Sequence, residues 1–344
     1  MNPTTIGLDI AKSCFQVHGV DEHGKTALQK RLRRTQVLGY FANLPACLIG
    51  IEACGSAHHW ARELSKLGHE VKLMSPQFVK AYVKTNKNDA RDAEAICEAV
   101  ARPNMRFVPI KTIEQQELLM LHRARQRLIQ ARTAQANQLR GLLAEFGFVL
   151  PQGLPALERD FPTILADTEN ALSSRLRERF SDLFRQLREL SEMVADWERE
   201  ILSWHRENPL SRRLQEIPGV GPLTASAFVA SVGDARTFKS GRQLAAWLGL
   251  VPRQDSSGGK IRLLGISKRG DRYLRTLLIL GARSVLARRK PTPGDWLERL
   301  KARCHPNIVA VALANKTARI IWALLVHNRE YVAGYRKRPA CATA

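Results

Sequence analysis

The sequence lacks the hallmarks of several common protein classes. Its six cysteines are scattered along 344 residues without one Cys-x-x-Cys pair, which argues against a zinc site or a disulfide framework and favours a reducing compartment. No uninterrupted apolar run reaches the ~18 residues of a membrane span. The residues after Met1 also lack the basic and then apolar order of a signal peptide. We therefore expect a cytoplasmic protein with no membrane partner.

Acidic side chains are scarce toward the C-terminus. The chain carries 54 Lys and Arg against 32 Asp and Glu, a formal net charge of +22. Residues 1–110 contribute +5 and residues 111–205 contribute −1, so residues 206–344 hold +18, with 26 basic and 8 acidic side chains. A solubility surface would spread this excess evenly. Its concentration in one region favours a polyanion such as nucleic acid, because neutralised phosphates release counterions.

The pattern of apolar residues predicts three domains, at residues 1–110, 111–205 and 206–336. In the first, three strands in a meander precede alternating helices and strands, which predicts an α/β fold with a mixed sheet and helices packed on it. The expected strands span residues 5–10, 14–20, 26–33, 47–51 and 70–74, and the expected helices span 36–43 and 57–67, with another beginning at Pro76.

The second predicted domain is a helical hairpin. Apolar residues recur at spacings of 4, 3, 4, 3 and 4 at Leu183, Leu187, Leu190, Val194, Trp197 and Ile201. Such a heptad is typical of a coiled-coil seam. A bend marked by Pro151, Pro155 and Pro162 separates this helix from the one before it. A protruding coiled coil and two helices packed on the body of the protein remain equal alternatives.

Four acidic residues in the first domain are candidates for a metal site. Asp9 lies in an otherwise apolar strand, and Glu52 ends a second buried strand. Asp89 and Asp92 are three residues apart, which places both on one face of a helix in its first turn. For Asp89 alone, helix capping is the simpler interpretation. Burying several carboxylates together is costly unless a cation neutralises them, so the set predicts bound Mg²⁺ or Mn²⁺.

Two glycine-rich turns in the third, mainly helical domain are candidate nucleic-acid contacts. Residues 217–221 (IPGVG) lie between two expected helices, where Gly219 and Gly221 would present backbone N–H groups beside a helix N-terminus. This pattern resembles the helix-hairpin-helix element that grips the DNA backbone; a plain turn is the simpler alternative. The second turn, Ser256-Ser257-Gly258-Gly259, is surrounded by basic residues: Arg253, Lys260, Arg262, Lys268, Arg269 and Arg272.

A serine in this second turn could attack a phosphate. Nearby cations would stabilise the charge that develops and ease ionisation of the hydroxyl. No histidine lies close in sequence to act as a base, so activation would come from elsewhere. Taken alone, Ser-Ser-Gly-Gly is an ordinary loop.

Taken together, these motifs resemble one family. GLDIAK at residues 7–12, IEACG at 51–55 and NKNDARDA at 86–93 occur in the order found in the DEDD insertion-sequence transposases. IPGVG at 217–221, LGLVP at 248–252 and the Ser-Gly turn resemble the transposase domain of that family. Nearly the whole chain therefore resembles the bridge-RNA-guided recombinases of insertion-sequence family one-hundred-and-ten and its eleven-eleven subgroup.

The resemblance implies a RuvC-like, RNase H-type domain in which Asp9, Glu52, Asp89 and Asp92 bind metal. It implies a serine that forms a phosphoserine link with DNA, at Ser257 when the alignment runs without gaps from Pro252 and at Ser256 when a gap falls earlier. It also implies a homo-oligomer, a dimer or tetramer, whose subunits share active sites between the acids of one and the serine of another. A structured guide RNA would select donor and target DNA, and the enzyme would work at the bacterial nucleoid.

Three other functions fit parts of the sequence. A metal-dependent junction resolvase would use the acids and a water, and would not need the serine. A sugar or acetate kinase of the actin-like fold also has Gly-x-Asp-x-x-Lys after its first strand, but the further glycine-rich phosphate turns are lacking. A non-enzymatic nucleic-acid-binding protein would explain the charge and leave the four acids unexplained.

Overall fold

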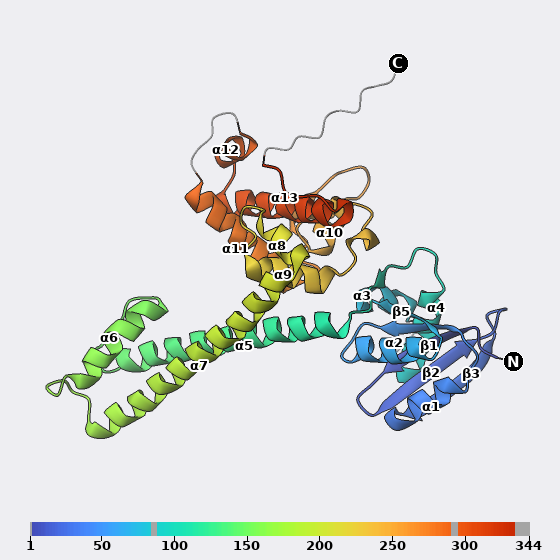
Figure 1. The fold of residues 1–344 in the computed structure, drawn as a ribbon, viewed down its shortest axis with the longest axis horizontal. Coiled ribbons are helices and arrows are strands. Elements are labelled where there is room, and N and C mark those ends of the chain that lie inside the picture. Colours follow the sequence, from blue (N-terminus) through green and yellow to red (C-terminus); the bar gives the residue numbers. More distant parts are fainter. Residues whose placement is uncertain (1, 84–87, 290–294, 334–344) are drawn as a thin grey trace, which may run out of the picture. The chain divides into compact units, whose positions relative to one another are not determined.

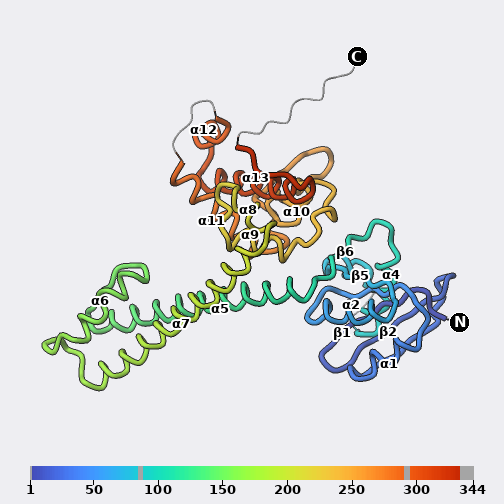
Figure 2. Tube along the Cα trace, in the orientation of Figure 1, coloured from blue at the N-terminus to red at the C-terminus, as the bar shows by residue number. Residues whose placement is uncertain are grey.

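The computed structural model describes residues 2–83, 88–289 and 295–333, and the chain divides into two compact units, Met1–Thr112 and Ile113–Ala344. Asn86 and Lys87 of the NKNDARDA motif lie outside the described residues. The five cysteines within the described ranges are free thiols. Figures 1 and 2 show the helices and strands of each unit.

Unit 1 is built on a six-stranded mixed sheet of order β3-β2-β1-β4-β5-β6. Strand β1 pairs antiparallel with β2 and parallel with β4, so the three-stranded meander continues into a parallel segment. The strands are β1 (Thr5–Ile10), β2 (Cys14–Val20), β3 (Thr26–Arg33), β4 (Leu48–Glu52), β5 (Glu70–Met74) and β6 (Phe107–Val108). The predicted mixed α/β architecture is confirmed, whereas the two-residue edge strand β6 gave no signal in the sequence.

Helices cover both faces of this sheet. Helices α1 (Val37–Ala42) and α2 (Ala57–Lys66) pack on the face that carries Ile6 and Leu8, in one apolar core. Helix α4 (Asp89–Val100) packs on the other face, where a second core includes Met74 and Ile96. The short helix α3 (Pro76–Val79) leads toward α4. The sheet is therefore the middle of three layers, as the sequence of buried strands and amphipathic helices predicts.

Unit 2 begins with a helical hairpin. Helices α5 and α7 lie side by side, with α6 at their far end (Figures 1 and 2). Their bounds are α5 (Ile113–Ala144), α6 (Leu154–Ala166) and α7 (Ser174–Glu207). The predicted heptad seam is confirmed, since Leu187, Val194 and Ile201 are buried one heptad apart.

The predicted proline-marked stretch does separate α5 from α7, but it also contains a helix, α6, that the sequence did not indicate. Pro155 stands in the first turn of α6, where a missing N–H costs nothing, and Pro162 lies inside the helix. Leu157 and Phe161 of α6 are fully buried against α5 and α7, in a core that includes Leu139 and Phe180. Tertiary packing therefore holds a helix where the prolines indicate an interruption.

The rest of unit 2 is a mainly helical body with one large apolar core. It contains α8 (Pro209–Gln215), α9 (Pro222–Val232), α10 (Gly241–Trp247), α11 (Arg272–Arg288), α12 (Trp296–Lys301), α13 (Pro306–His327) and a two-stranded sheet of β7 (Pro252–Gln254) and β8 (Leu263–Ile266).

Helix α13 is long and apolar enough to span a membrane by composition alone. Its Ala314, Ala318 and Ile321 are instead buried in the core of this body, which is the pattern of a core helix.

Candidate active site

Two glycines bring α4 directly onto the sheet of unit 1. A Cβ at Gly7 of β1 would collide with the backbone of α4 at Ala93 and Cys97, and a Cβ at Gly50 of β4 would lie 2.7 Å from Val100 Cβ. Only glycine permits this approach, so the helix rests on the pair Gly7 and Gly50, which are neighbours in the parallel register.

The same register decides where the strand acids point. Side chains alternate along a strand, so Asp9 and Glu52, each two residues after one of these glycines, face the layer that contains α4. Helix α4 begins at Asp89, and its first turn carries Asp89 and Asp92. The chain thus directs four acids from three elements to one end of the helix–sheet interface.

Three of these acids converge closely. Carboxylate oxygens of Asp9, Asp89 and Asp92 all lie within 4.8 Å of one another, with Asp9 and Asp92 half-buried and Asp89 exposed. Glu52 lies outside that 4.8 Å group, but its charge contributes to raising the pKa of Asp9.

The surroundings of the Asp9 carboxyl group raise its pKa. Burial is the largest cause that raises its pKa from 3.8 to about 6, followed by the negative charges of Asp92, Asp89 and Glu52. A hydrogen bond from the backbone N–H of Ile10 opposes the shift without cancelling it. Such a group stays ionised at neutral pH at a cost that a cation would remove, so the donor set fits a hard divalent metal ion.

Asp89 does not cap α4, so the capping interpretation of this residue was wrong. The N-cap is Asn88, whose side-chain oxygen accepts a hydrogen bond from the Ala90 N–H at 3.1 Å. With the cap supplied by its neighbour, Asp89 has its carboxylate available beside Asp9 and Asp92. The partial positive charge of the helix N-terminus also favours two acids in this turn.

The serine turn is the tip of a regular β-hairpin in unit 2. Gly258 and Gly259 both have positive φ, at +54° and +78°, as a two-residue type I′ turn requires. On either side, Ser257 pairs with Lys260 and Gln254 pairs with Leu263. The Asp255 N–H donates to the Arg262 carbonyl at 3.0 Å, so one constant register runs from residue 254 to residue 263.

This register places the two serines on opposite faces. Residues that pair across strands share a face, and neighbours along a strand alternate. Ser257 therefore shares its face with Lys260, Arg262 and Asp255. Arg253, four residues before Ser257 on the same strand, lies on this face too. Ser256 shares the other face with Ile261 and Leu263.

The two hydroxyls also differ in their hydrogen bonds. Ser256 Oγ accepts from the Gln254 side-chain amide at 3.0 Å and from the Arg262 N–H at 3.2 Å. Ser256 thus supports the fold of the hairpin through two hydrogen bonds, and both serines are exposed.

The root of the hairpin is fastened to the helical body. The Ser267 N–H donates to the Val251 carbonyl at 2.8 Å, and the buried guanidinium of Arg275 donates to the Leu248 carbonyl at 2.9 Å. All six cations predicted around the turn are exposed: Arg253, Lys260, Arg262, Lys268, Arg269 and Arg272. Asp271, beside Arg272, caps α11 by accepting the Leu274 N–H at 3.0 Å.

The IPGVG turn joins α8 to α9. Gly219, with φ +84°, lies against Gly281 of α11, where a Cβ on either glycine would strike the backbone of the other. Gly221 is exposed at the N-cap of α9, with open space where a Cβ would stand. Gly219 thus serves helix packing, and Gly221 is the one of the pair that faces solvent at a helix N-terminus.

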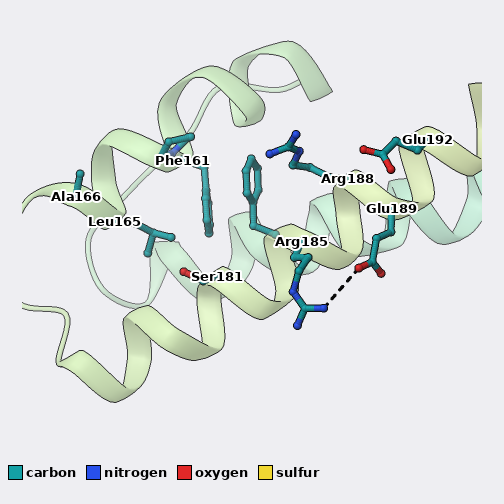
Figure 3. Close-up of a pocket in the computed structure, with 10 residues that line it drawn as sticks. Phe161, Leu165, Ala166, Ser181, Arg185, Arg188, Glu189 and Glu192 are labelled. Atoms are coloured by element: carbon teal, nitrogen blue, oxygen red, sulfur yellow. Dashed lines mark hydrogen bonds and ion pairs between the residues drawn. The ribbon is translucent and has the colours of Figure 1, made fainter.

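A groove of about 650 Å³ lies between α6 and α7. None of the four candidate metal-binding acids and neither candidate serine nucleophile lines it. Phe161 and Phe184, which line it, are stacked with ring centroids 4.4 Å apart. Figure 3 shows Phe161 in the groove and the Arg185–Glu189 ion pair at its edge. The half-buried acids Asp9 and Asp92 and the exposed serines lie outside this groove, so its shape does not point to them.

Two family profiles match this chain, one over the stretch that carries the acids and one over the stretch that carries the IPGVG and serine turns. A family profile described as DEDD transposase of the IS110 type matches residues 6–148, and one described as the transposase IS116/IS110/IS902 family matches residues 211–295. A probable family 20 transposase of Pseudomonas aeruginosa is 52% identical over 97% of this chain and 100% of its own length. The chain belongs to the IS110 family of insertion-sequence transposases.

Other relatives of this transposase carry the names of insertion-sequence elements. The transposase for IS1111A of Coxiella burnetii is 46% identical over 96% of this chain and 91% of its own length. The transposase for IS1328 of Yersinia enterocolitica is 42% identical over 94% of this chain and 97% of its own length. The protein is therefore a DNA transposase, an enzyme of DNA recombination. Transposases of the DEDD type generally use a divalent metal ion.

Sequence reasoning missed a buried polar network in unit 2 of the transposase. His122 of α5 lies 3.0 Å from Tyr273 Oη of α11 through Nδ1 and 3.1 Å from Ser226 Oγ of α9 through Nε2. Arg125, one turn after His122, forms a hydrogen-bonded ion pair with Glu198 of α7 at 2.9 Å. These residues are far apart in sequence, and an isolated histidine on a helix gives no signal that they meet.

Proposed function

We propose that this transposase cuts and rejoins DNA by combining its acidic cluster with a serine of the β7–β8 hairpin. The observation that carries the proposal is the convergence of Asp9, Asp89 and Asp92, with a pKa of about 6 for Asp9. Mg²⁺ or Mn²⁺ suits such oxygen ligands. Glu52 is proposed as the fourth acid, because it follows Gly50 as Asp9 follows Gly7 in adjacent parallel strands.

A divalent ion held by these acids would neutralise the scissile phosphate and orient the oxygen that attacks it. Around the serine, Lys260 and Arg262 would hold a phosphate against the hydroxyl and stabilise the negative charge that develops on it. The serine Oγ–P bond forms as the P–O bond to the departing sugar oxygen breaks. The serine hydroxyl loses its proton and the departing oxygen gains one. Rejoining is the reverse, with a sugar hydroxyl of the new partner strand attacking the phosphoserine.

Ser257 is the proposed nucleophile. Both serines are exposed, but Ser257 shares its face with three cations and one acid, Asp255. Ser256 lies on the face of Ile261 and Leu263 and accepts two hydrogen bonds within the hairpin. A phosphate drawn to Lys260 and Arg262 would therefore meet Ser257 and not Ser256.

The DNA-binding proposal extends to the surroundings of this hairpin. Lys268, Arg269 and Arg272 are exposed near its root. Gly221 adds a helix N-terminus that suits a phosphate. We propose that residues 217–221 act as a helix-hairpin-helix contact with the DNA backbone, held in place by the packing of Gly219 on α11.

Further parts of the proposal rest on the resemblance to bridge-RNA-guided recombinases. Unit 1 would be a RuvC-like, RNase H-type domain, and the chain would act as three domains, at residues 1–110, 111–205 and 206–336. A structured RNA would guide the choice of donor and target DNA. A dimer or tetramer would pair the acids of one subunit with the serine of another, in the bacterial cytoplasm at the nucleoid.

The test separates a serine recombinase from a resolvase that uses water. The full-length protein is incubated with its RNA, DNA and Mg²⁺, stopped in denaturant, and examined for protein attached to a DNA end. We expect attachment in the wild type and in Ser256→Ala, and none in Ser257→Ala, with the modified peptide mapped by mass spectrometry. Normal cleavage by Ser257→Ala would reject serine chemistry, and attachment at Ser256 would move the nucleophile by one residue.

A further inference from the structure

The face of the β7–β8 hairpin opposite Ser257 is apolar and uncovered. Ile261 is 78% exposed and Leu263 is 61% exposed, and both lie on this face with Gln254 and Ser256. Two strands alone have no core to shelter such side chains. Large aliphatic residues at the end of a polar hairpin therefore indicate a partner that covers them.

Charge complementarity identifies the partner as nucleic acid. The other face of the same hairpin carries three cations, Arg253, Lys260 and Arg262, against one acid, Asp255, and the root adds further exposed cations. A partner whose groove takes in the whole hairpin contacts Ile261 on one face and these cations on the other. A polyanion with an apolar interior satisfies both faces at once, and stacked bases between two phosphate backbones have that composition.

The shape of the element fits the same partner. A two-stranded β-ribbon fits into a groove of duplex DNA, and aliphatic wedges such as Ile and Leu are inserted between base pairs by proteins that kink DNA. The strand pairing places Ile261 directly across from Ser256, so the apolar face begins one residue from the proposed nucleophile.

We propose that Ile261 and Leu263 form an apolar wedge that unstacks a base step of duplex DNA beside the phosphate presented to Ser257. The inference deepens the proposed function and rests on it. Unstacking would bend the backbone at that step and expose the scissile phosphate to the hydroxyl. It would also favour flexible pyrimidine–purine steps, which cost less to open than the stiff steps of an A-tract.

The test uses full-length protein carrying Ser257→Ala, so that cleavage does not intervene. The probe is a short duplex with 2-aminopurine beside a central TA step, and a matched duplex carries the reporter within an A-tract. Binding should raise the fluorescence of the first duplex and should be tighter for it by on the order of tenfold. Adding Ile261→Ser and Leu263→Ser should abolish both the rise and the preference, while the salt dependence of binding is retained.

Leu280→Ser is the matched control, because Leu280 is 53% exposed on α11 and lies outside the hairpin. It should leave the fluorescence rise unchanged. Circular dichroism checks the fold, and Ile261→Ser alone serves if the double variant unfolds. Equal unstacking by the wedge variant and its parent would overturn the proposal. So would a loss of oligomer in sedimentation with the reporter unaffected, which would assign the face to protein contact. If the serine chemistry itself is wrong, the wild type will form no covalent adduct with DNA while the 2-aminopurine fluorescence still rises, so the two failures can be told apart.

Discussion

His122 provides a pH-dependent test of how the helical hairpin is attached to the body of unit 2. Its imidazole is 1% exposed and bonded to Ser226 and Tyr273. Ser226 donates its hydroxyl hydrogen to the Pro222 carbonyl at 2.7 Å, so the Nε2–H of His122 must donate to Ser226 Oγ. Nδ1 then accepts from Tyr273, and a proton on Nδ1 would force the Tyr273 hydroxyl to turn and accept instead.

The structure gives the magnitude of this effect. Burial first, and the charge of Arg125 second, lower the pKa of His122 from 6.5 to about 4. Because one pKa unit corresponds to about 1.4 kcal/mol, this change corresponds to roughly 3 kcal/mol. The folded pKa lies below the unfolded one, so the stabilising contribution is complete above pH 6.5 and is lost as pH falls through 4.

The assay compares urea unfolding of the wild type and His122→Gln from pH 7.5 to pH 4. The difference in free energy of unfolding between the two should shrink by about 3 kcal/mol over this range, because the variant has nothing to protonate. Tyr273→Phe is the matched control, since it removes a hydrogen bond worth about 1 kcal/mol and keeps the titrating group.

Nuclear magnetic resonance of isotope-labelled histidines measures the pKa directly. A value for His122 near 6.5, or an unchanged pH dependence in His122→Gln, would refute the reasoning. Either result would mean that water reaches the junction of α5, α9 and α11, and that the network does not hold these helices together.

Three further predictions test the acids, the seam and the basic surface. Because the pKa of Asp9 is raised, its ionisation destabilises the fold as pH rises through about 6. Asp9→Asn should therefore stabilise the metal-free protein at pH 8 by about 1 kcal/mol after solvent screening. This difference in stability between the variant and the wild type should vanish by pH 4. The same variant should lose the rise in melting temperature on adding Mg²⁺ and should lose DNA cleavage; an undiminished response to Mg²⁺ would contradict the metal site. Leu187→Asp with Val194→Asp should cost several kcal/mol and separate α5 from α7, seen as lower helicity or altered sedimentation; full helicity with an unchanged oligomer would contradict the seam. Lys268→Ala with Arg269→Ala should weaken binding of unrelated DNA sequences about equally and reduce the salt slope by up to about one unit per contact; altered sequence preference with an unchanged slope would count against a phosphate role.

Local patterns in the sequence predicted most of the fold of unit 1 because its strands are short, apolar and bounded by turns. The predicted strands at residues 5–10, 14–20, 26–33 and 70–74 match β1, β2, β3 and β5 residue for residue. Helix α6 was missed because prolines dominate its local signal, whereas the burial of Phe161 against α5 and α7 determines the outcome. Contacts such as those of His122 with Ser226 and Tyr273 span 104 and 151 residues, and no local pattern encodes them.

The serine hairpin gives different surroundings to two residues that the sequence leaves equivalent. Alignment alone permits Ser256 or Ser257, because they are adjacent and chemically identical. The Gly258-Gly259 turn makes the two serines different. Because this two-residue turn pairs Ser257 with Lys260, that pair determines which side chains of the hairpin share a face. A sequence argument that began from the turn type would have assigned the same faces.

The acidic cluster depends on a pattern that is visible in the sequence once its physical reason is known. Two adjacent parallel strands carry Gly-x-acid at or next to their C-terminal ends, as Gly7-Leu8-Asp9 and Gly50-Ile51-Glu52. The glycine clears room for a helix to lie on the sheet, and the acid two residues later must face the same side. The helix that fills this room then brings its own first turn to the acids, and the N-cap at Asn88 leaves Asp89 free of a capping role. Replacing Gly7 with Ala would therefore displace Ala93 and Cys97 and move Asp89 and Asp92 away from Asp9, so the glycine is as necessary to the acidic cluster as the acids themselves.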